Sequence, residues 1–95
     1  MPLSLDARVT ASPRQVSTEV GNETVILELQ EGVYYGLDDV GSFIWRQLSE
    51  PRTVHDLRDA ILASYDVDAE RCEHDLQAIL QEMATSGLVQ IEGPA

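Results

Sequence analysis

Apolar and polar residues alternate along three stretches in the first forty residues, which is the spacing of β-strands. These stretches are Gln15 to Val20, Thr24 to Gln30 and Val33 to Leu37. Between them lie Gly21-Asn22 and Glu31-Gly32, two pairs that suit tight reversals. The pattern predicts a three-stranded antiparallel β-meander. Its last strand must lie at an edge, because the middle strand is already paired on both sides.

From Asp39 onward the apolar spacing becomes helical. The pattern predicts a first helix from Asp39 to Ser49, with Trp45 at the border of its apolar stripe and therefore only partly buried. A second helix is expected to begin at Thr53, which with Asp56 forms a variant of the capping box, and to end near Tyr65.

A third helix is the most strongly patterned part of the chain. Asp66 or Asp68 can cap its start, and Gly87 is expected to stop it. Beyond it, Leu88 to Ile91 could add a brief strand or simply pack down. The predicted fold class is α+β: the meander followed by three helices, in a winged helix-turn-helix-like arrangement. The apolar stripe of the third helix comprises Cys72, Leu76, Ile79, Leu80 and Met83.

Ninety-five residues make one small domain. We expect a domain over residues 14–91, an N-terminal segment over residues 1–13 with a short extended piece at Arg8 to Ala11, and a tail over residues 92–95. No apolar run approaches the roughly 18 residues of a membrane helix. Met1 to Asp6 lacks the basic start and apolar stretch of a signal peptide, and the single cysteine cannot form an internal disulfide. A cytoplasmic location is therefore expected.

The charge balance excludes several partners. Six arginines, no lysine and seventeen carboxylates give a formal net charge of −11. Nucleic acid and anionic membranes attract clustered basic side chains, so neither is expected as a partner. The polar face of the third helix is acidic, which argues against using a helix-turn-helix shape to bind DNA.

Catalytic and metal-binding patterns are weak. Cys72, His74 and Asp75 are close in sequence, but residues two apart on a helix face different directions. The only other histidine is His55, and there is no second cysteine to complete a zinc site. Cys72 therefore fits a small core residue, and no cofactor, metal or enzymatic activity is expected.

The edge strand Val33 to Leu37 contains none of the lysines, prolines or inward charges that usually protect a free edge. Two interpretations follow. Two copies of the strand could pair and give a homodimer, or a foreign extended peptide could add to the edge and place alternate side chains in pockets between strand and helix.

Several short motifs, in this order and spacing, resemble the PqqD family. The resemblance covers roughly Glu23 to Ile91. It rests on Val33-Tyr34-Tyr35-Gly36-Leu37-Asp38, Gly41-Ser42-Phe43-Ile44-Trp45, Thr53-Val54 with Leu57, Asp75-Leu76 and Gly87-Leu88-Val89.

The resemblance implies a recognition element for ribosomally synthesised and modified peptides, which binds a precursor's leader segment without catalysis. The spacing is most similar to the stand-alone leader-binding proteins of lasso-peptide clusters. That implies a separate leader protease as partner, a cyclase downstream and a leader with a Tyr-x-x-Pro motif. The alternatives are a peptide chaperone for a radical or other modifying enzyme, as in pyrroloquinoline quinone synthesis, and a self-associating domain.

The resemblance also implies where the peptide lies, namely between Val33 to Leu37 and the third helix, about Arg71 to Met83. Strand backbone would form the ladder, and the helix stripe would supply the floor of the pockets. Asp75 could hydrogen-bond the leader or anchor the helix. The implied peptide-binding residues are Val33, Tyr34, Tyr35, Gly36, Leu37, Cys72, Asp75, Leu76, Ile79, Leu80 and Met83.

Overall fold

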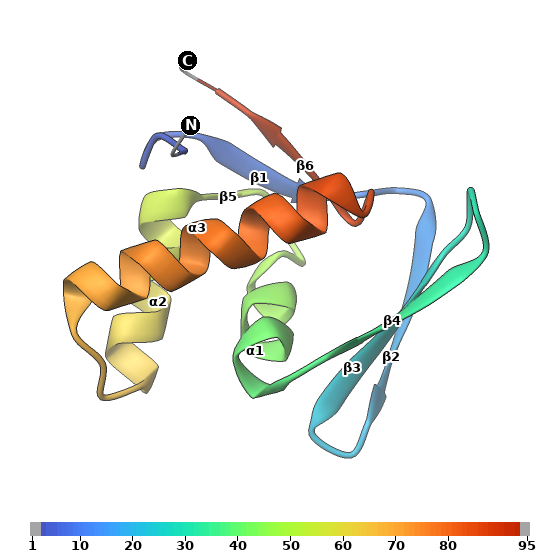
Figure 1. Cartoon of the computed structure of the whole chain (residues 1–95), viewed down its shortest axis with the longest axis horizontal. Helices are drawn as coiled ribbons and strands as arrows, with labels where there is room; N and C mark the ends of the chain where they lie inside the picture. The colour runs from blue at the N-terminus through green and yellow to red at the C-terminus, as the bar shows by residue number, and fades with distance from the viewer. Residues whose placement is uncertain (1–2, 94–95) are drawn as a thin grey trace.

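Three helices and six strands make up the fold of the computed structural model, which describes residues 3–93 (Figure 1). The strands form two antiparallel sheets, ordered β2-β3-β4 and β5-β1-β6. The expected α+β class is confirmed, with one sheet more than the pattern predicted. In chain order the elements are β1 (Arg8–Ala11), β2 (Gln15–Val20), β3 (Glu23–Glu28), β4 (Val33–Leu37), α1 (Asp39–Gln47), β5 (Arg52–Thr53), α2 (Val54–Ser64), α3 (Ala69–Thr85) and β6 (Val89–Glu92).

The meander β2-β3-β4 is confirmed, including β4 at its edge. Its second reversal differs from the expectation, because the loop spans residues 29–32 and not Glu31-Gly32 alone. The side chain of Glu28 accepts hydrogen bonds from the backbone N–H groups of Gln30 and Glu31, at 2.7 and 3.0 Å. These bonds end β3 two residues early, and Gly32 closes the loop with a φ of 72°.

The second sheet joins the two ends of the described chain. β1 lies at its centre, pairing with β5 on one side and β6 on the other. The extended piece expected at Arg8 to Ala11 is confirmed, and the residues after α3 form a strand. Val9 has no exposed surface and belongs to the same core cluster as the buried residues of the helices, so β1 is part of the core.

The helix starts follow local capping chemistry. Asp38 caps α1 by accepting a hydrogen bond from the N–H of Gly41 at 2.8 Å. Thr53 and Asp56 form the expected capping box at α2, and Asp68 caps α3. The first helix ends at Gln47, two residues before the expected end.

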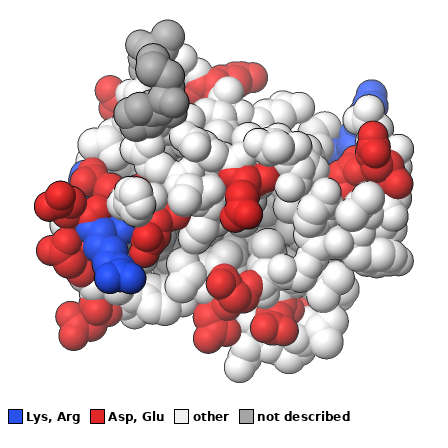
Figure 2. Space-filling view, viewed as in Figure 1, with Lys and Arg blue, Asp and Glu red and all other residues white. Residues whose placement is uncertain are grey.

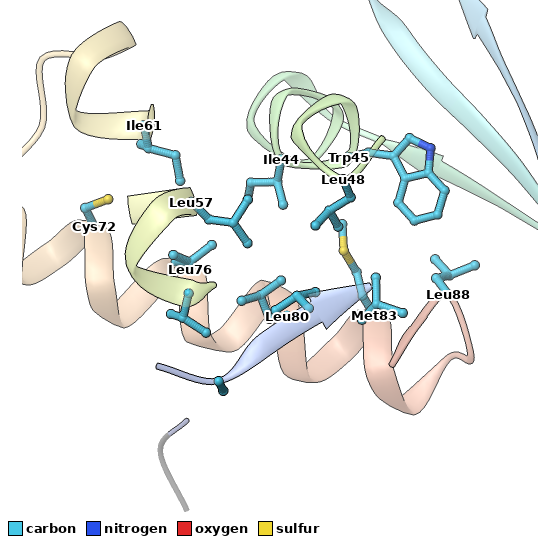
Figure 3. Packing of buried hydrophobic residues seen from close by; sticks show 14 of the residues in the cluster. Ile44, Trp45, Leu48, Leu57, Ile61, Cys72, Leu76, Leu80, Met83 and Leu88 are labelled. Carbon is cyan, nitrogen blue, oxygen red and sulfur yellow. The ribbon is translucent and has the colours of Figure 1, made fainter. Parts of the chain in front are cut away.

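The core lies where the three helices meet. In Figure 3, side chains of α3 such as Leu76 and Leu80 point toward Ile44 of α1 and Leu57 of α2. Trp45 is 8% exposed, so the expectation of partial burial is wrong. It lies beside Gln15 and the end of β1, a neighbour that the helix pattern alone does not reveal.

A buried serine fixes the meander to the helices. The hydroxyl of Ser42, on α1, accepts a hydrogen bond from the N–H of Thr24 at 2.9 Å and donates one to the carbonyl of Leu37 at 3.2 Å. Ser42 has no exposed surface; its bond with Thr24 is buried and shielded from water, and its bond with Leu37 is partly buried. They hold the end of β4 against α1 and thereby set the position of β4 relative to the helices.

Candidate functional site

β4 presents alternate side chains to opposite faces of the meander. Tyr35 pairs with Ile26 of β3 and Leu37 pairs with Thr24, and both partners are buried. Directly paired residues share a face, so Tyr35 and Leu37 lie on the inner face, toward the helices. Tyr34 lies on the opposite, outer face and is 70% exposed.

The stripe of α3 contains one accessible apolar residue. Leu80 has no exposed surface, and Leu76 has 1%. Cys72 and Met83 are also buried, whereas Ile79 is only partly buried. Ile79 is therefore the position at which the α3 stripe can contact a ligand with least rearrangement.

Between β4 and the C-terminal half of α3 lies an open hollow. Its walls come from both elements, so it is the space that a strand added to β4 would face. The surface of this hollow is part polar and part apolar, and Glu82 supplies a carboxylate to it. Among the lining residues are Tyr35, Gly36, Leu37, Ile79, Glu82 and Met83.

A second hollow continues along the N-terminal half of α3, and Ile79 lines both. Its volume is about 110 Å³. Cavities that hold benzene measure about 150 Å³, so this hollow suits one apolar side chain. Its wall is almost wholly apolar and comes from all three helices. Among the lining residues are Val40, Ile44, Ile61, Tyr65, Cys72 and Leu76.

Few charges border the apolar hollow. Arg71 Nε and Asp75 Oδ2 are 3.7 Å apart at its rim, and both side chains are largely exposed. Burial, and secondarily the charge of Glu73, raises the pKa of the Cys72 thiol. Acidic side chains are distributed over the visible face, with basic ones at only a few places (Figure 2). We call the two hollows together the groove: its N-terminal part along α3 is apolar with Arg71 and Asp75 at the rim, and its part beside β4 is mixed and includes Glu82.

An ion pair joins α3, which lines both hollows, to α2. Arg58 of α2 donates to Glu73 of α3 at 2.9 Å and also contacts Asp59. Its pKa is raised, chiefly by the hydrogen bond to Glu73. The pair ties α2 to α3 beside the apolar hollow, at the level of Cys72.

The structure brings most of the expected site residues together, but not all. Val33 lies at the neighbouring β3–β4 loop with Tyr35, and Tyr34 points away on the outer face. Leu80 is fully buried and lines neither hollow, so its role is in the core. The remaining residues line one or both hollows: Tyr35, Gly36, Leu37, Cys72, Asp75, Leu76, Ile79 and Met83.

Sequence reasoning missed the contribution of α1 and α2. Val40, Ile61 and Tyr65 line the apolar hollow, and the Tyr65 ring packs edge-on against Phe43 with centroids 5.4 Å apart. The helical spacing of apolar residues indicates only that Val40 and Ile61 lie on the inward faces of their helices. It gave no means of distinguishing a core position from one beside an opening.

Over residues 3–93, no cluster of three or more His, Cys, Asp or Glu side chains is placed to hold a metal ion. Within the same range, no helix combines the length and apolar character needed to cross a membrane.

The fold and groove define a small α+β recognition domain, with an uncharged strand edge beside an open hollow that leads to an apolar hollow along α3. The chain belongs to the PqqD family, whose model, described as coenzyme PQQ synthesis protein D, matches residues 23–89. The resemblance inferred from the motifs is thereby confirmed. No curated protein matches the chain.

Two solved structures are similar to it. TbiB1 in complex with the TbiA(beta) leader peptide is 42% identical, with a TM-score of 0.80 over 90% of this chain and 98% of that one. Lasso peptide synthetase B1 complexed with the leader peptide is 18% identical, with a TM-score of 0.71 over 86% of this chain and 96% of that one. At that lower identity, the second likeness concerns the fold alone.

Proposed function

We propose that this chain binds the leader segment of a ribosomally synthesised precursor peptide in lasso-peptide biosynthesis. The observation that carries the proposal is the uncharged β4 edge next to an open hollow, which shares Ile79 with the apolar hollow farther along α3. Membership of the PqqD family and 42% identity to a protein solved with a leader peptide support it. The chain delivers the bound leader to a separate leader protease or other modifying enzyme.

Binding proceeds by addition of a strand to β4. The leader's backbone forms a ladder with Val33, Tyr34, Tyr35 and Gly36, while alternate leader side chains face the helices. Main-chain pairing fixes register but carries little sequence information, so specificity comes from the hollows. Those leader side chains lie on the same face as Tyr35 and Leu37 and reach toward Ile79.

The apolar hollow is the main anchor site. Burying one large apolar side chain contributes about 1.5 to 3 kcal/mol, which is roughly 10- to 150-fold in the dissociation constant. Such an anchor offsets part of the cost of ordering an extended leader, about 1 to 2 kcal/mol per residue. Asp75, at the rim, can accept a hydrogen bond from the leader when it is released from Arg71.

The chain acts as a tether and not as a catalyst. Cys72 is the nucleophilic side chain nearest the apolar hollow, and burial disfavours its reactive thiolate. The chain contributes by raising the effective concentration of the leader at the partner enzyme. The proposal places the chain in the cytoplasm, where precursor peptides are synthesised and where a free thiol persists.

The test is a calorimetric titration with a synthetic leader containing Tyr-x-x-Pro, with a Tyr-to-Ala leader as control. We expect saturable one-to-one binding that the control leader lacks. If neither leader binds, the lasso assignment fails. The family match then favours the alternative of a peptide chaperone for the radical enzyme of pyrroloquinoline quinone synthesis, tested with that pathway's precursor.

Self-association through β4 is the competing use of the same edge. The net charge of −11 on each copy opposes it. Sedimentation of the peptide-free chain distinguishes the two uses. We expect a monomer, whereas a tight dimer that dissociates on addition of leader would mean that β4 is also a dimer edge.

A further inference from the structure

The face of the meander that points away from the helices is apolar. Along β2, residues that point to this face alternate with residues that point toward the helices. Val16 is 59% exposed and Val20 is 61% exposed. We call this surface the outer face, and its members are Val16, Thr18, Val20, Glu23, Val25, Leu27, Tyr34 and Gly36.

Solvated faces of antiparallel sheets usually carry polar side chains. Here, Val16, Leu27 and Tyr34 form one row across all three strands, and Thr18 and Val25 form the next. That second row ends at Gly36, where an added Cβ would meet no atom within 4 Å. Among the described residues nothing covers Gly36, so the outer face is flat and open at the β4 side. Contiguous exposed apolar surface of this kind marks interaction sites.

The charge of the chain indicates which kind of partner can bind the outer face. Among the outward-facing strand residues one is charged, Glu23, and four of the six arginines in the whole chain are held in ion pairs with carboxylates. A second copy would bring another net charge of −11 to the face, which opposes pairing of like chains. A protein with an apolar patch bordered by Lys and Arg would instead be attracted.

We propose that the outer face docks the enzyme that acts on the bound leader, through an apolar patch with a basic border. This inference rests on the proposed function, since it takes the leader to be the fourth strand of the sheet. The added strand widens the outer face next to Tyr34 and contributes its own outward side chains. The enzyme then contacts chain and leader together and binds the loaded form more tightly. By reciprocity, it strengthens leader binding by the same factor.

The experiment compares two single substitutions on β2. Val16→Glu places a charge within the outer face, and Ser17→Glu places the same charge on the opposite face of the same strand. Both side chains are exposed, so both variants should fold. Each is titrated with the synthetic leader alone and then, with leader present, with the purified leader-processing enzyme of the same biosynthetic system.

The proposal predicts that Val16→Glu weakens binding of the enzyme about tenfold or more, as truncation of an interface anchor does. Leader binding should remain unchanged, because β2 is two strands away from the β4 edge. Ser17→Glu should resemble the unsubstituted chain in both titrations. Affinity for the enzyme should also fall as salt increases.

Three results would overturn the docking surface: enzyme binding to Val16→Glu at unchanged affinity, no enzyme binding to the leader-loaded chain, or a dimer of the chain that Val16→Glu abolishes. Loss of enzyme binding in both variants would also contradict it, since it would mean that any added charge is harmful. If the chain binds no leader but binds the enzyme in a manner sensitive to Val16→Glu, the docking surface holds while the proposed function fails.

Discussion

The two small sheets both have three strands, but they differ in the length and charge of their edge strands and in the exposure of their apolar residues. In β5-β1-β6, the central strand is buried at Val9, and the edges are a two-residue strand with Arg52 and a four-residue strand ending at Glu92. In β2-β3-β4, the edge strand β4 has five residues and no charge. The outer face beside it is apolar and exposed.

Short, charged edges are a common protection against unwanted pairing. The sheet that joins the chain ends has this protection, and we assign it to stability. β4 lacks it, even though a single Lys or Glu would have supplied it. β2 is also an edge, but Glu19 on that strand is engaged by Arg46, and the open hollow beside the C-terminal half of α3 adjoins β4 instead. The contrast indicates that the β4 edge is left open for a ligand.

The largest expected effect tests the contrast directly with the same substitution in both sheets. Val9→Ala removes fully buried methyl groups, so the free energy of unfolding should fall by about 2 to 4 kcal/mol. Val20→Ala, at a position 61% exposed, should change it by less than about 1 kcal/mol. Urea denaturation followed by circular dichroism measures both. Equal losses would mean that the meander is as much a part of the core as the β1 sheet.

The second prediction concerns the groove. Ile79→Asn should weaken leader binding about tenfold or more, because an apolar wall shared by both hollows becomes polar. Ala78→Asn is the matched control, since Ala78 is exposed on the same helix and receives the same side chain. Calorimetry measures both affinities. If the Ile79→Asn variant binds the leader as well as the control does, the groove is not the leader-binding site.

The third prediction uses Cys72 as a reporter. Its raised pKa leaves less thiolate at pH 7 to 8, so iodoacetamide should modify it more slowly than it modifies the unfolded chain. A leader side chain in the apolar hollow should slow the reaction further. Mass spectrometry follows the adduct with and without leader. Acceleration by the leader would show that binding opens α3 instead of covering it.

The smallest effect is electrostatic and lies on β2. Hydrogen bonds from Thr24 and then Arg46 lower the pKa of Glu19 from its usual 4.5. A lowered pKa stabilises the fold above pH 4.5, and this contribution disappears as pH falls through the folded value. Glu19→Gln should therefore unfold at a slightly lower temperature at pH 7, with the gap closing in acid. Glu23→Gln controls for the loss of one charge; a gap that widens in acid would contradict the assignment.

Local patterns predicted much of the fold. The meander follows from period-two alternation and two glycine-containing turns, the start of α2 follows from Thr53, and the start of α3 follows from Asp68, one of its two candidate caps. The second sheet was not predicted as a sheet. Its strands have two to four residues, too few to show a period, and β1 pairs with residues more than 40 positions away. Burial of Trp45 was missed for the same reason.

The site was predicted to the extent that it depends on one strand and one helix. Alternation on β4 and the stripe on α3 identified both walls. They could not separate Ile79, which faces the hollows, from Leu80, which faces the core, because adjacent residues on a helix are only 100° apart. Nor could they reveal Val40 and Tyr65, which reach the apolar hollow through packing between helices.

The most direct test of strand addition is amide hydrogen exchange by NMR, with and without saturating leader. The account predicts that amides of Val33–Leu37 that point away from β3 become protected when the leader binds, while those of β2 and β6 do not change. Protection at β2, or binding with no new protection in β4, would contradict the claim that β4 is the recognition edge.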